Sequence, residues 1–208
     1  MHIQEGVLSN SAGGIAALGA GAVLAAAGTA VGLKRLDQER VPRVAVLSSA
    51  LFVASLIHVP IGPSSAHLIL NGLAGVVLGW ACFPAFLIAL FLQALLFGFG
   101  GLTTLGINTC NMALPGVVCY YLFRAAIRGA GPSRVFAAGF GAGAGAIVLA
   151  ALLTGAALLC AGSEFRVIVH GVVLVHLPVA AIEGLITGQV ALFLRKVRPE
   201  LLDGAARA

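Results

Sequence analysis

The first residues of the chain, MHIQEG, place a histidine directly behind the N-terminal methionine. The imidazole Nδ1 of His2, its backbone nitrogen and the α-amine of Met1 can together wrap one metal ion in two fused chelate rings. The backbone amide has to lose its proton for this, so the ion must be a strongly polarising transition metal. Nitrogen donors in one plane suit Ni²⁺ or Cu²⁺, and low-spin Co²⁺ extends that rule, whereas Mg²⁺ and Ca²⁺ prefer oxygen. The other interpretation is a frayed surface histidine.

A fourth donor has to come from elsewhere in the chain, and His67, which follows the sequence GPSS, is the best candidate. A ten-residue tail can stretch about 33 Å, so His2 can reach it. A hydrogen-bonded histidine at a helix end is the competing interpretation of His67. His58 is expected to lie nearby without binding the metal. His170 and His176 lie six residues apart on one predicted helix and are expected to be packing residues.

Polar residues near the glycine-rich stretch LFGFGGLTTLGINTCNM are candidates for supporting such ligands by hydrogen bonds. Irregular backbone at membrane depth is tolerated only where it lines a cavity or is buried in protein. We therefore expect this loop to fold into the mouth of a bundle, with outer-shell partners that orient the imidazoles. The candidates for this role are His58, Ser65, Gln93, Asn108 and Asn111. Glu183, an acid inside a predicted span, either has a functional role or pairs with an arginine near the span's end.

The composition shows which elements have to position these residues. Sixty per cent of the residues are hydrophobic and 9% are charged, against about a quarter charged in a soluble domain. Apolar runs of roughly 20 residues are typical of spanning helices. The sequence therefore predicts an all-α, polytopic membrane bundle forming a single domain over residues 1–208. The expected spans are 11–33, 44–60, 65–80, 82–99, 108–127, 134–161 and 165–194.

Basic residues give the expected orientation, because loops rich in lysine and arginine stay in the cytoplasm. Seven spans put three basic clusters on one side and leave Arg166 on the other. The N-terminus is then outside and the C-terminus cytoplasmic. The net charge of +5 belongs to these span ends and does not indicate a nucleic-acid partner. The clusters are Lys34, Arg35, Arg40 and Arg43; Arg124, Arg128 and Arg134; and Arg195, Lys196, Arg198 and Arg207.

Three stretches of the chain resemble the CbiM/NikM family: MHIQEG at the start, GPSSAHLILNGLAGVVLG, and LQALLFGFGGLTTLGINTCNM. The resemblance covers about residues 1–195. It implies a substrate-binding S component of an energy-coupling-factor (ECF) transporter for Co²⁺ or Ni²⁺, with seven spans and an N-terminus that dips into the bundle from outside. It further implies that the terminal amine of Met1, the backbone nitrogen and imidazole of His2, and His67 hold the metal.

The resemblance also implies partners in the plasma (inner) membrane. These are a transmembrane T component, two ABC ATPases, since this sequence has no GxxxxGK[ST] phosphate loop, and, where one is needed, a separate small N-type accessory protein. Two other classes stay open on the residues alone. An intramembrane hydrolase would use Ser64 or Ser65 with a histidine, but has no GxSG context. A passive cation channel would want rings of carbonyls or carboxylates, and the expected outer links hold only Glu164.

Overall fold

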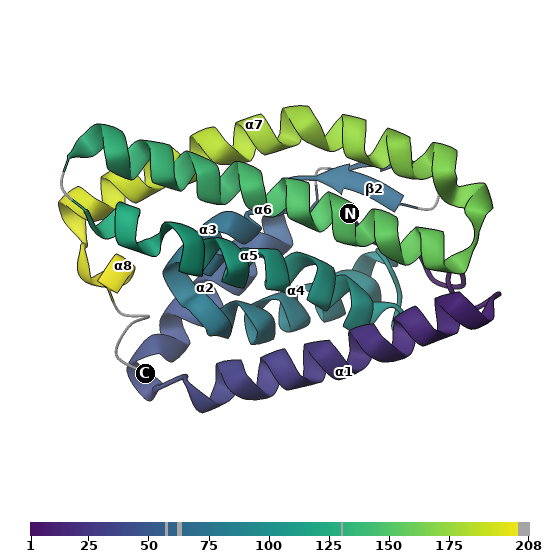
Figure 1. Ribbon diagram of the computed structural model, residues 1–208. Helices are drawn as coiled ribbons and strands as arrows, with labels where there is room; N and C mark the ends of the chain where they lie inside the picture. Colours follow the sequence, from purple (N-terminus) through teal and green to yellow (C-terminus); the bar gives the residue numbers. More distant parts are fainter. Residues whose placement is uncertain (57, 62–63, 130, 204–208) are drawn as a thin grey trace.

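The chain folds into a bundle of helices that is interrupted by one two-stranded hairpin (Figure 1). The computed structural model describes residues 1–56, 58–61, 64–129 and 131–203, and only the backbone of residues 58–61, 64–66 and 203. The helices are α1 (Ala12–Lys34), α2 (Val41–Ala54), α3 (Asn71–Leu78), α4 (Cys82–Phe97), α5 (Leu105–Arg128), α6 (Pro132–Ala161), α7 (Arg166–Val197) and the short α8 (Glu200–Asp203); the strands are β1 (His58–Ile61) and β2 (Ser64–His67). Short 3₁₀ turns cover Gln38–Arg40, Gly79–Ala81 and Ser163–Phe165.

Helix α5 lies in the middle of the bundle, with α6 and α7 on one side of it and α1, α3 and α4 on the other (Figure 1). The N-terminal tail, residues 1–11, turns back from the start of α1 into the interior. Its first residue lies beside β2 and is fully buried. The fold therefore encloses the very end of the chain, which in most proteins is exposed and frayed.

Helices α3 and α4 run in opposite directions along α5. The indole Nε1 of Trp80, just after α3, donates to the hydroxyl of Tyr121 near the end of α5 (3.0 Å). The far end of α4 lies instead close to the start of α5. Gly79, with φ +58°, makes the turn between the two helices, a conformation that costs glycine little. A Cβ at Gly75 would overlap the backbone of Gly116, so glycine lets α3 approach α5 closely.

Five of the expected spans coincide with α1, α4, α5, α6 and α7 to within a few residues, and the predicted membrane helix bundle is confirmed. The other two expectations are wrong in extent. Instead of one helix over 44–60, α2 ends at Ala54 and β1 begins at His58. Instead of one over 65–80, β2 is followed by the eight-residue α3. Pro60 explains part of this, because proline disfavours helix both at its own position and at the preceding one.

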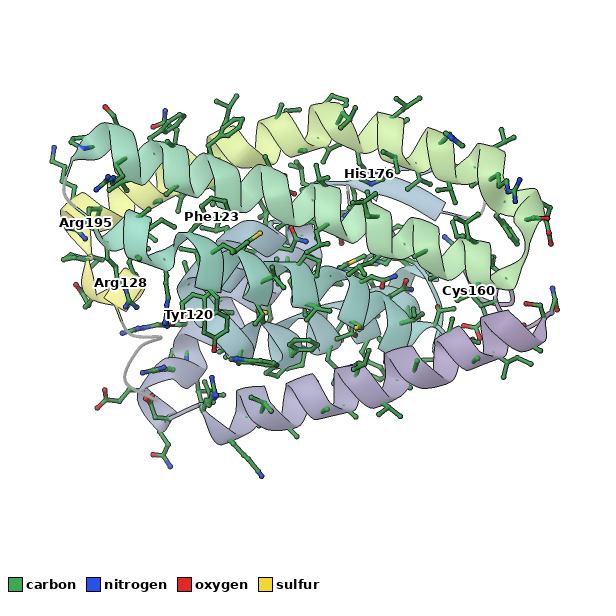
Figure 2. All side chains as sticks on the ribbon, in the orientation of Figure 1. Tyr120, Phe123, Arg128, Cys160, His176 and Arg195 are labelled. Atoms are coloured by element: carbon green, nitrogen blue, oxygen red, sulfur yellow. The ribbon has the colours of Figure 1, made fainter. Side chains whose placement is uncertain are left out.

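The described members of the three basic clusters gather at one end of the bundle, as the expected topology requires, while Arg207 lies outside the described residues. Arg128 and Arg195 lie at this end in Figure 2, and Cys160 lies at the opposite end. The guanidinium of Arg35 lies 5.7 Å from the ring centroid of Trp80, and Arg128 donates to the carbonyl of Leu202 (3.2 Å). Which side of the membrane this end faces stays a prediction.

Among the described residues, five stretches are long and apolar enough to cross a membrane. They are Ala12–Lys34, Asn71–Phe97, Leu105–Arg128, Pro132–Ala161 and Ser163–Val197. The second stretch contains both α3 and α4, which the turn at Gly79 separates. With its 14 residues, α2 is too short to be counted.

Candidate metal centre

The backbone of the tail is held by Asn108, in the first turn of α5. Its side-chain Oδ1 accepts a hydrogen bond from the backbone N–H of Ile3 (2.9 Å), and its Nδ2 donates to the carbonyl of Ile3 (3.0 Å). Both residues are buried. One amide side chain therefore satisfies both polar groups of residue 3, much as a neighbouring strand would.

The glycine-rich loop between α4 and α5 holds the tail a little further along. The backbone N–H of Glu5 donates to the carbonyl of Gly100 (2.9 Å), and the hydroxyl of Thr103 donates to the Glu5 carboxylate (2.5 Å). A Cβ at Gly101 would overlap that carboxylate. The loop is thus shaped around the tail, and Glu5 is an anchor that nothing in the sequence singled out.

Met1 lies inside the hydrophobic core, with 0% of its surface exposed. The hydroxyl of Thr154 on α6 donates to its sulfur (3.9 Å), and Asn111 Nδ2 donates in turn to the Thr154 oxygen (3.5 Å). Burial lowers the pKa of the Met1 α-amine from 8.0 to about 4. At neutral pH the amine is therefore uncharged, which is the form that can bind a metal.

His2 has its tautomer fixed by Gln93 on α4. The ring Nε2 lies 2.7 Å from the side-chain oxygen of Gln93, and both residues are buried. Because that oxygen can only accept, Nε2 carries the proton and Nδ1 is the unprotonated ring nitrogen. Nδ1 is also the nitrogen closer to the backbone of His2, as the chelate suggested by the sequence requires.

His67, at the end of β2, lies against His2. The two imidazoles are stacked, with ring centroids 4.6 Å apart and planes inclined by 21°. His67 Nδ1 donates to the carbonyl of Leu68 (2.8 Å), so Nε2 is unprotonated. This buried Nε2 has no hydrogen-bond partner in the described part of the chain. Burial, followed by the nearby terminal amine and His2, holds the pKa of His67 well below its usual value, so the ring is neutral.

The structure separates the remaining candidates. The strand register places His58 opposite His67 and Ser65 opposite Pro60, but the side chains of residues 58 and 65 lie outside the described part. His170 is exposed and donates to the carbonyl of Arg166 (2.7 Å). His176 is buried, lies on the side of α7 that faces β2 in Figure 2, and donates to the carbonyl of Val172 (2.6 Å).

Among the described residues, Glu183 does not pair with an arginine near the C-terminal end of α7. It is fully buried and accepts hydrogen bonds from the backbone amides of Ile69 and Leu70, directly after His67. Sequence reasoning also missed Thr154. Its signal was present as the single polar residue in the run AIVLAALLTGAALL, but a lone threonine in an apolar helix has no specific meaning.

The described residues contain no cluster of three or more His, Cys, Asp or Glu side chains with the geometry of a metal site. The arrangement found here needs only two such side chains, because its other two nitrogens belong to the main chain at Met1 and His2. What the structure brings together at the buried end of the chain is the terminal amine and the imidazoles of His2 and His67. The class of protein defined by fold and site is therefore a multi-pass membrane protein with an enclosed candidate site for a transition metal.

Comparisons with known proteins agree with this class. The profile of the family described as "Cobalt uptake substrate-specific transmembrane region" matches residues 2–201, and the chain belongs to this family. A metal transport protein of Haemophilus influenzae is 46% identical over 208 residues, which are 98% of this chain and 97% of the relative. The cobalt transport protein CbiM of Sorangium cellulosum is 33% identical, with 78% of this chain and 76% of the relative covered.

Two further matches concern length and fold. The fused nickel transport protein NikMN of Rhodobacter capsulatus is 35% identical over 83% of this chain, but the match covers only 56% of that longer protein. The crystal structure of a transition metal transporter superposes with a TM-score of 0.77 at 30% identity, covering 100% of this chain and 99% of the other. The chain is accordingly a membrane protein of a cobalt and nickel transport family.

Proposed function

We propose that this chain is the S component of an ECF-type transporter that captures Ni²⁺ or Co²⁺ from the outer side of the plasma membrane with high affinity. The observation that carries the proposal is the pair of tautomers. His2 and His67 each donate through one ring nitrogen to a protein oxygen, and each is left with an unprotonated nitrogen at the buried end of the chain. Histidines that bind metals are commonly oriented in this way.

The proposed donors are the α-amine of Met1, the deprotonated amide nitrogen and Nδ1 of His2, and Nε2 of His67. The three nitrogens of the tail occupy three corners of a square, and His67 supplies the fourth. Such a set suits Ni²⁺ and, by extension, low-spin Co²⁺. When two imidazoles bind the same ion, each directs a nitrogen lone pair at the ion within the plane of its own ring. The stacked rings of His2 and His67 therefore have to rotate before both can bind.

The chain itself is proposed to act without enzymatic activity. ATP hydrolysis would be carried out by two ABC ATPases, coupled through a transmembrane T component and, where one is needed, a small N-type accessory protein. The sequence has no phosphate-binding GxxxxGK[ST] motif that could do this within the chain. Dependence on these partners separates the proposal from a passive cation channel, which would conduct without them.

Metal binding by the purified chain with a free Met1 amine, verified by intact mass, tests the proposal. Competitive titration with Ni²⁺, Co²⁺, Zn²⁺ and Mg²⁺ should give one bound ion per chain, with Mg²⁺ rejected. In vesicles, uptake should require the T component, the ATPases and ATP. A chain that binds no transition metal, or that admits the ion without ATPases, contradicts the proposal.

Capture from the outer side requires the orientation expected from the basic clusters. In a Cys160→Ala background, which removes an exposed thiol, a cysteine at position 163 should react with an impermeant reagent from outside. A cysteine at position 39 should react only from the cytoplasm. Labelling of both positions from the same side would overturn the topology.

A further inference from the structure

We propose that Glu183 is a positioning residue, which holds and orients His67 from the neighbouring helix α7. The inference rests on the function proposed above and adds a residue that takes no part in the donor set. Glu183 lies in the middle of α7, with 0% of its surface exposed, and is the only acid among the buried residues that the structure describes. A buried carboxylate at membrane depth is costly unless hydrogen bonds satisfy it.

The carboxylate binds the segment that follows His67. Its Oε1 accepts from the backbone N–H of Ile69 and from that of Leu70 (2.8 Å), and its Oε2 also accepts from Leu70 (2.9 Å). Leu70 is the one non-glycine residue with positive φ in the described part of the chain, at +56°. This conformation is unfavourable for leucine and persists only where its surroundings enforce it. Glu183 is the group that binds the backbone there.

A single peptide unit links Glu183 to the imidazole of His67. The N–H of Ile69, which donates to Glu183, belongs to the same rigid peptide plane as the carbonyl of Leu68. That carbonyl accepts the hydrogen bond from His67 Nδ1 (2.8 Å). In a trans peptide the N–H and C=O point in opposite directions within the plane, so the carboxylate and the imidazole lie at opposite edges of the peptide unit.

This arrangement has two consequences for His67. Fixing the plane fixes the direction of the Leu68 carbonyl, which selects the tautomer with an unprotonated Nε2. Hydrogen bonds in a chain also polarise one another, so the carboxylate strengthens the pull of the carbonyl on the Nδ1 proton. Carboxylates are known to orient metal-binding histidines by direct contact; here the peptide unit transmits the effect.

Loss of the acceptor in Glu183→Ala should weaken metal binding by about 10- to 100-fold, the range for outer-shell partners. Glu183→Gln keeps one acceptor oxygen in the same place and should restore most of the affinity. Glu183→Asp draws the carboxylate back by one methylene and should not. Thr187→Val, one turn further along α7 with a hydroxyl that has no partner in the described part, is the matched control and should bind like the parent.

Two measurements separate positioning from a general loss of structure. In metal-free protein, hydrogen exchange should accelerate in a peptide covering residues 68–71 of Glu183→Ala and stay unchanged in Thr187→Val. With Cu²⁺ as probe, pulsed EPR should count two imidazoles in the parent, and in Glu183→Ala the coupling of one of the two should be altered. A merely destabilised protein would bind fewer ions with an unaltered spectrum, and that result would overturn the proposal.

The outcomes also distinguish this inference from the proposed function. If the parent binds no metal, the function fails, while the exchange measurement still decides whether Glu183 holds the segment. If the parent binds metal with two imidazoles and Glu183→Ala has the same affinity and spectrum, Glu183 is not a positioning residue. If the alanine variant fails to fold, the metal affinities of the parent, Glu183→Gln and Glu183→Asp decide whether Glu183 is a positioning residue. We expect affinity to decrease in that order, and equal affinities of all three overturn the proposal.

Discussion

The two histidines of the candidate site are held by regions of very different construction. His2 belongs to a tail fixed to three elements, through Gln93 on α4, the loop at Gly100 and Asn108 on α5. His67 ends a hairpin that packs against α7, and Glu183 on that helix binds the backbone just after His67. The tail is thus tied at each of Met1, His2, Ile3 and Glu5, whereas the described bonds next to His67 run to one residue of one helix.

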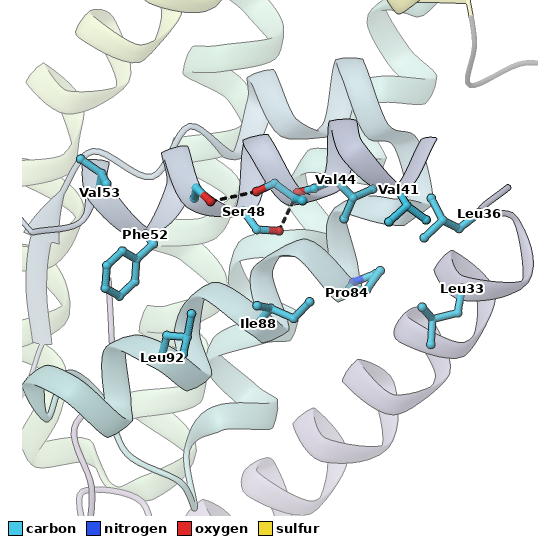
Figure 3. A pocket seen from close by; sticks show the side chains of 12 residues that line it. Leu33, Leu36, Val41, Val44, Ser48, Phe52, Val53, Pro84, Ile88 and Leu92 are labelled. Atoms are coloured by element: carbon cyan, nitrogen blue, oxygen red, sulfur yellow. Dashed lines mark hydrogen bonds between the residues drawn. The ribbon is translucent and has the colours of Figure 1, made fainter. Parts of the chain in front are cut away.

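The helix that leads into the hairpin is also loosely packed. An apolar hollow of about 410 Å³ lies between α2 and the neighbouring parts of α1 and α4, bordered by Leu36, Phe52 and Ile88 among others (Figure 3). A second hollow of about 390 Å³ separates α2 from α3 and α7. Regions with few buried contacts open most easily. The comparison therefore makes the tail the fixed half of the site and the hairpin the half that adjusts when the rings turn.

The largest effect should come from lengthening the fixed half. One residue added before Met1 converts its amine into a peptide nitrogen and adds about 3.3–3.6 Å to a tail whose first residue is fully buried. We expect metal uptake to be abolished while the protein still folds, as circular dichroism can verify. N-acetylation should act alike, because an amide is a far poorer donor than an amine.

A C-terminal tag of equal size is the control for this experiment and should leave uptake intact. A lengthened terminus can still chelate a metal by itself through one more amide nitrogen. The amount of bound metal therefore does not show whether the site with His67 is intact. Pulsed EPR on Cu²⁺ should then count one imidazole instead of two. Full uptake by the lengthened chain would show that the tail is not the fixed half of the site.

Removal of the imidazole from the adjustable half should be nearly as severe. His67→Ala leaves the square of nitrogens one donor short, and water fills that corner weakly. Uptake should be lost, and affinity should fall by more than the roughly 100-fold upper range of outer-shell effects. His170→Ala, which alters an exposed histidine, should behave like the parent. If His67→Ala bound metal normally, His58, opposite it in the strand register, would be the next candidate.

A smaller effect is expected from untying one point of the tail. Asn108→Ala leaves both polar groups of the Ile3 backbone without their partner, and affinity should fall by about 10- to 100-fold. Thr109→Val alters the adjacent residue of α5, a buried threonine whose hydroxyl has no partner in the described part, and should have no effect. Titration calorimetry on both variants measures the difference. Equal affinities would mean that the tail does not depend on this bond.

The smallest effect should come from the side chain of Met1. Thr154→Val removes only the hydroxyl that donates to its sulfur, a weak bond of about 0.5 kcal/mol, so affinity should fall by about twofold. The same titration, with Thr109→Val again as control, resolves a change of this size when run as a competition. A loss of affinity as large as that of Asn108→Ala would mean that α6, and not α5, provides the main anchor of the tail.

Much of the fold could be predicted from the sequence because hydropathy and charge act locally. Five long helices follow from uninterrupted apolar runs, and the basic residues at their ends predicted that three clusters would share one end of the bundle. The prediction for residues 44–80 was wrong because it used the same local signal. These residues are as apolar as a span, but a hairpin packed against α7 also pairs its backbone groups, and an apolar run does not distinguish the two.

For the candidate site, the sequence by itself predicted the proposed donors and their chemistry. The chelate of Met1 and His2 depends only on neighbouring atoms, and therefore follows from the order of the first two residues. The tertiary structure alone decided which partners fix each tautomer and what lies behind His67. Gln93 meets His2 across 91 positions, and Glu183 meets Leu70 across 113. Pairings over such separations depend on how helices pack, and no local pattern in the chain records that packing.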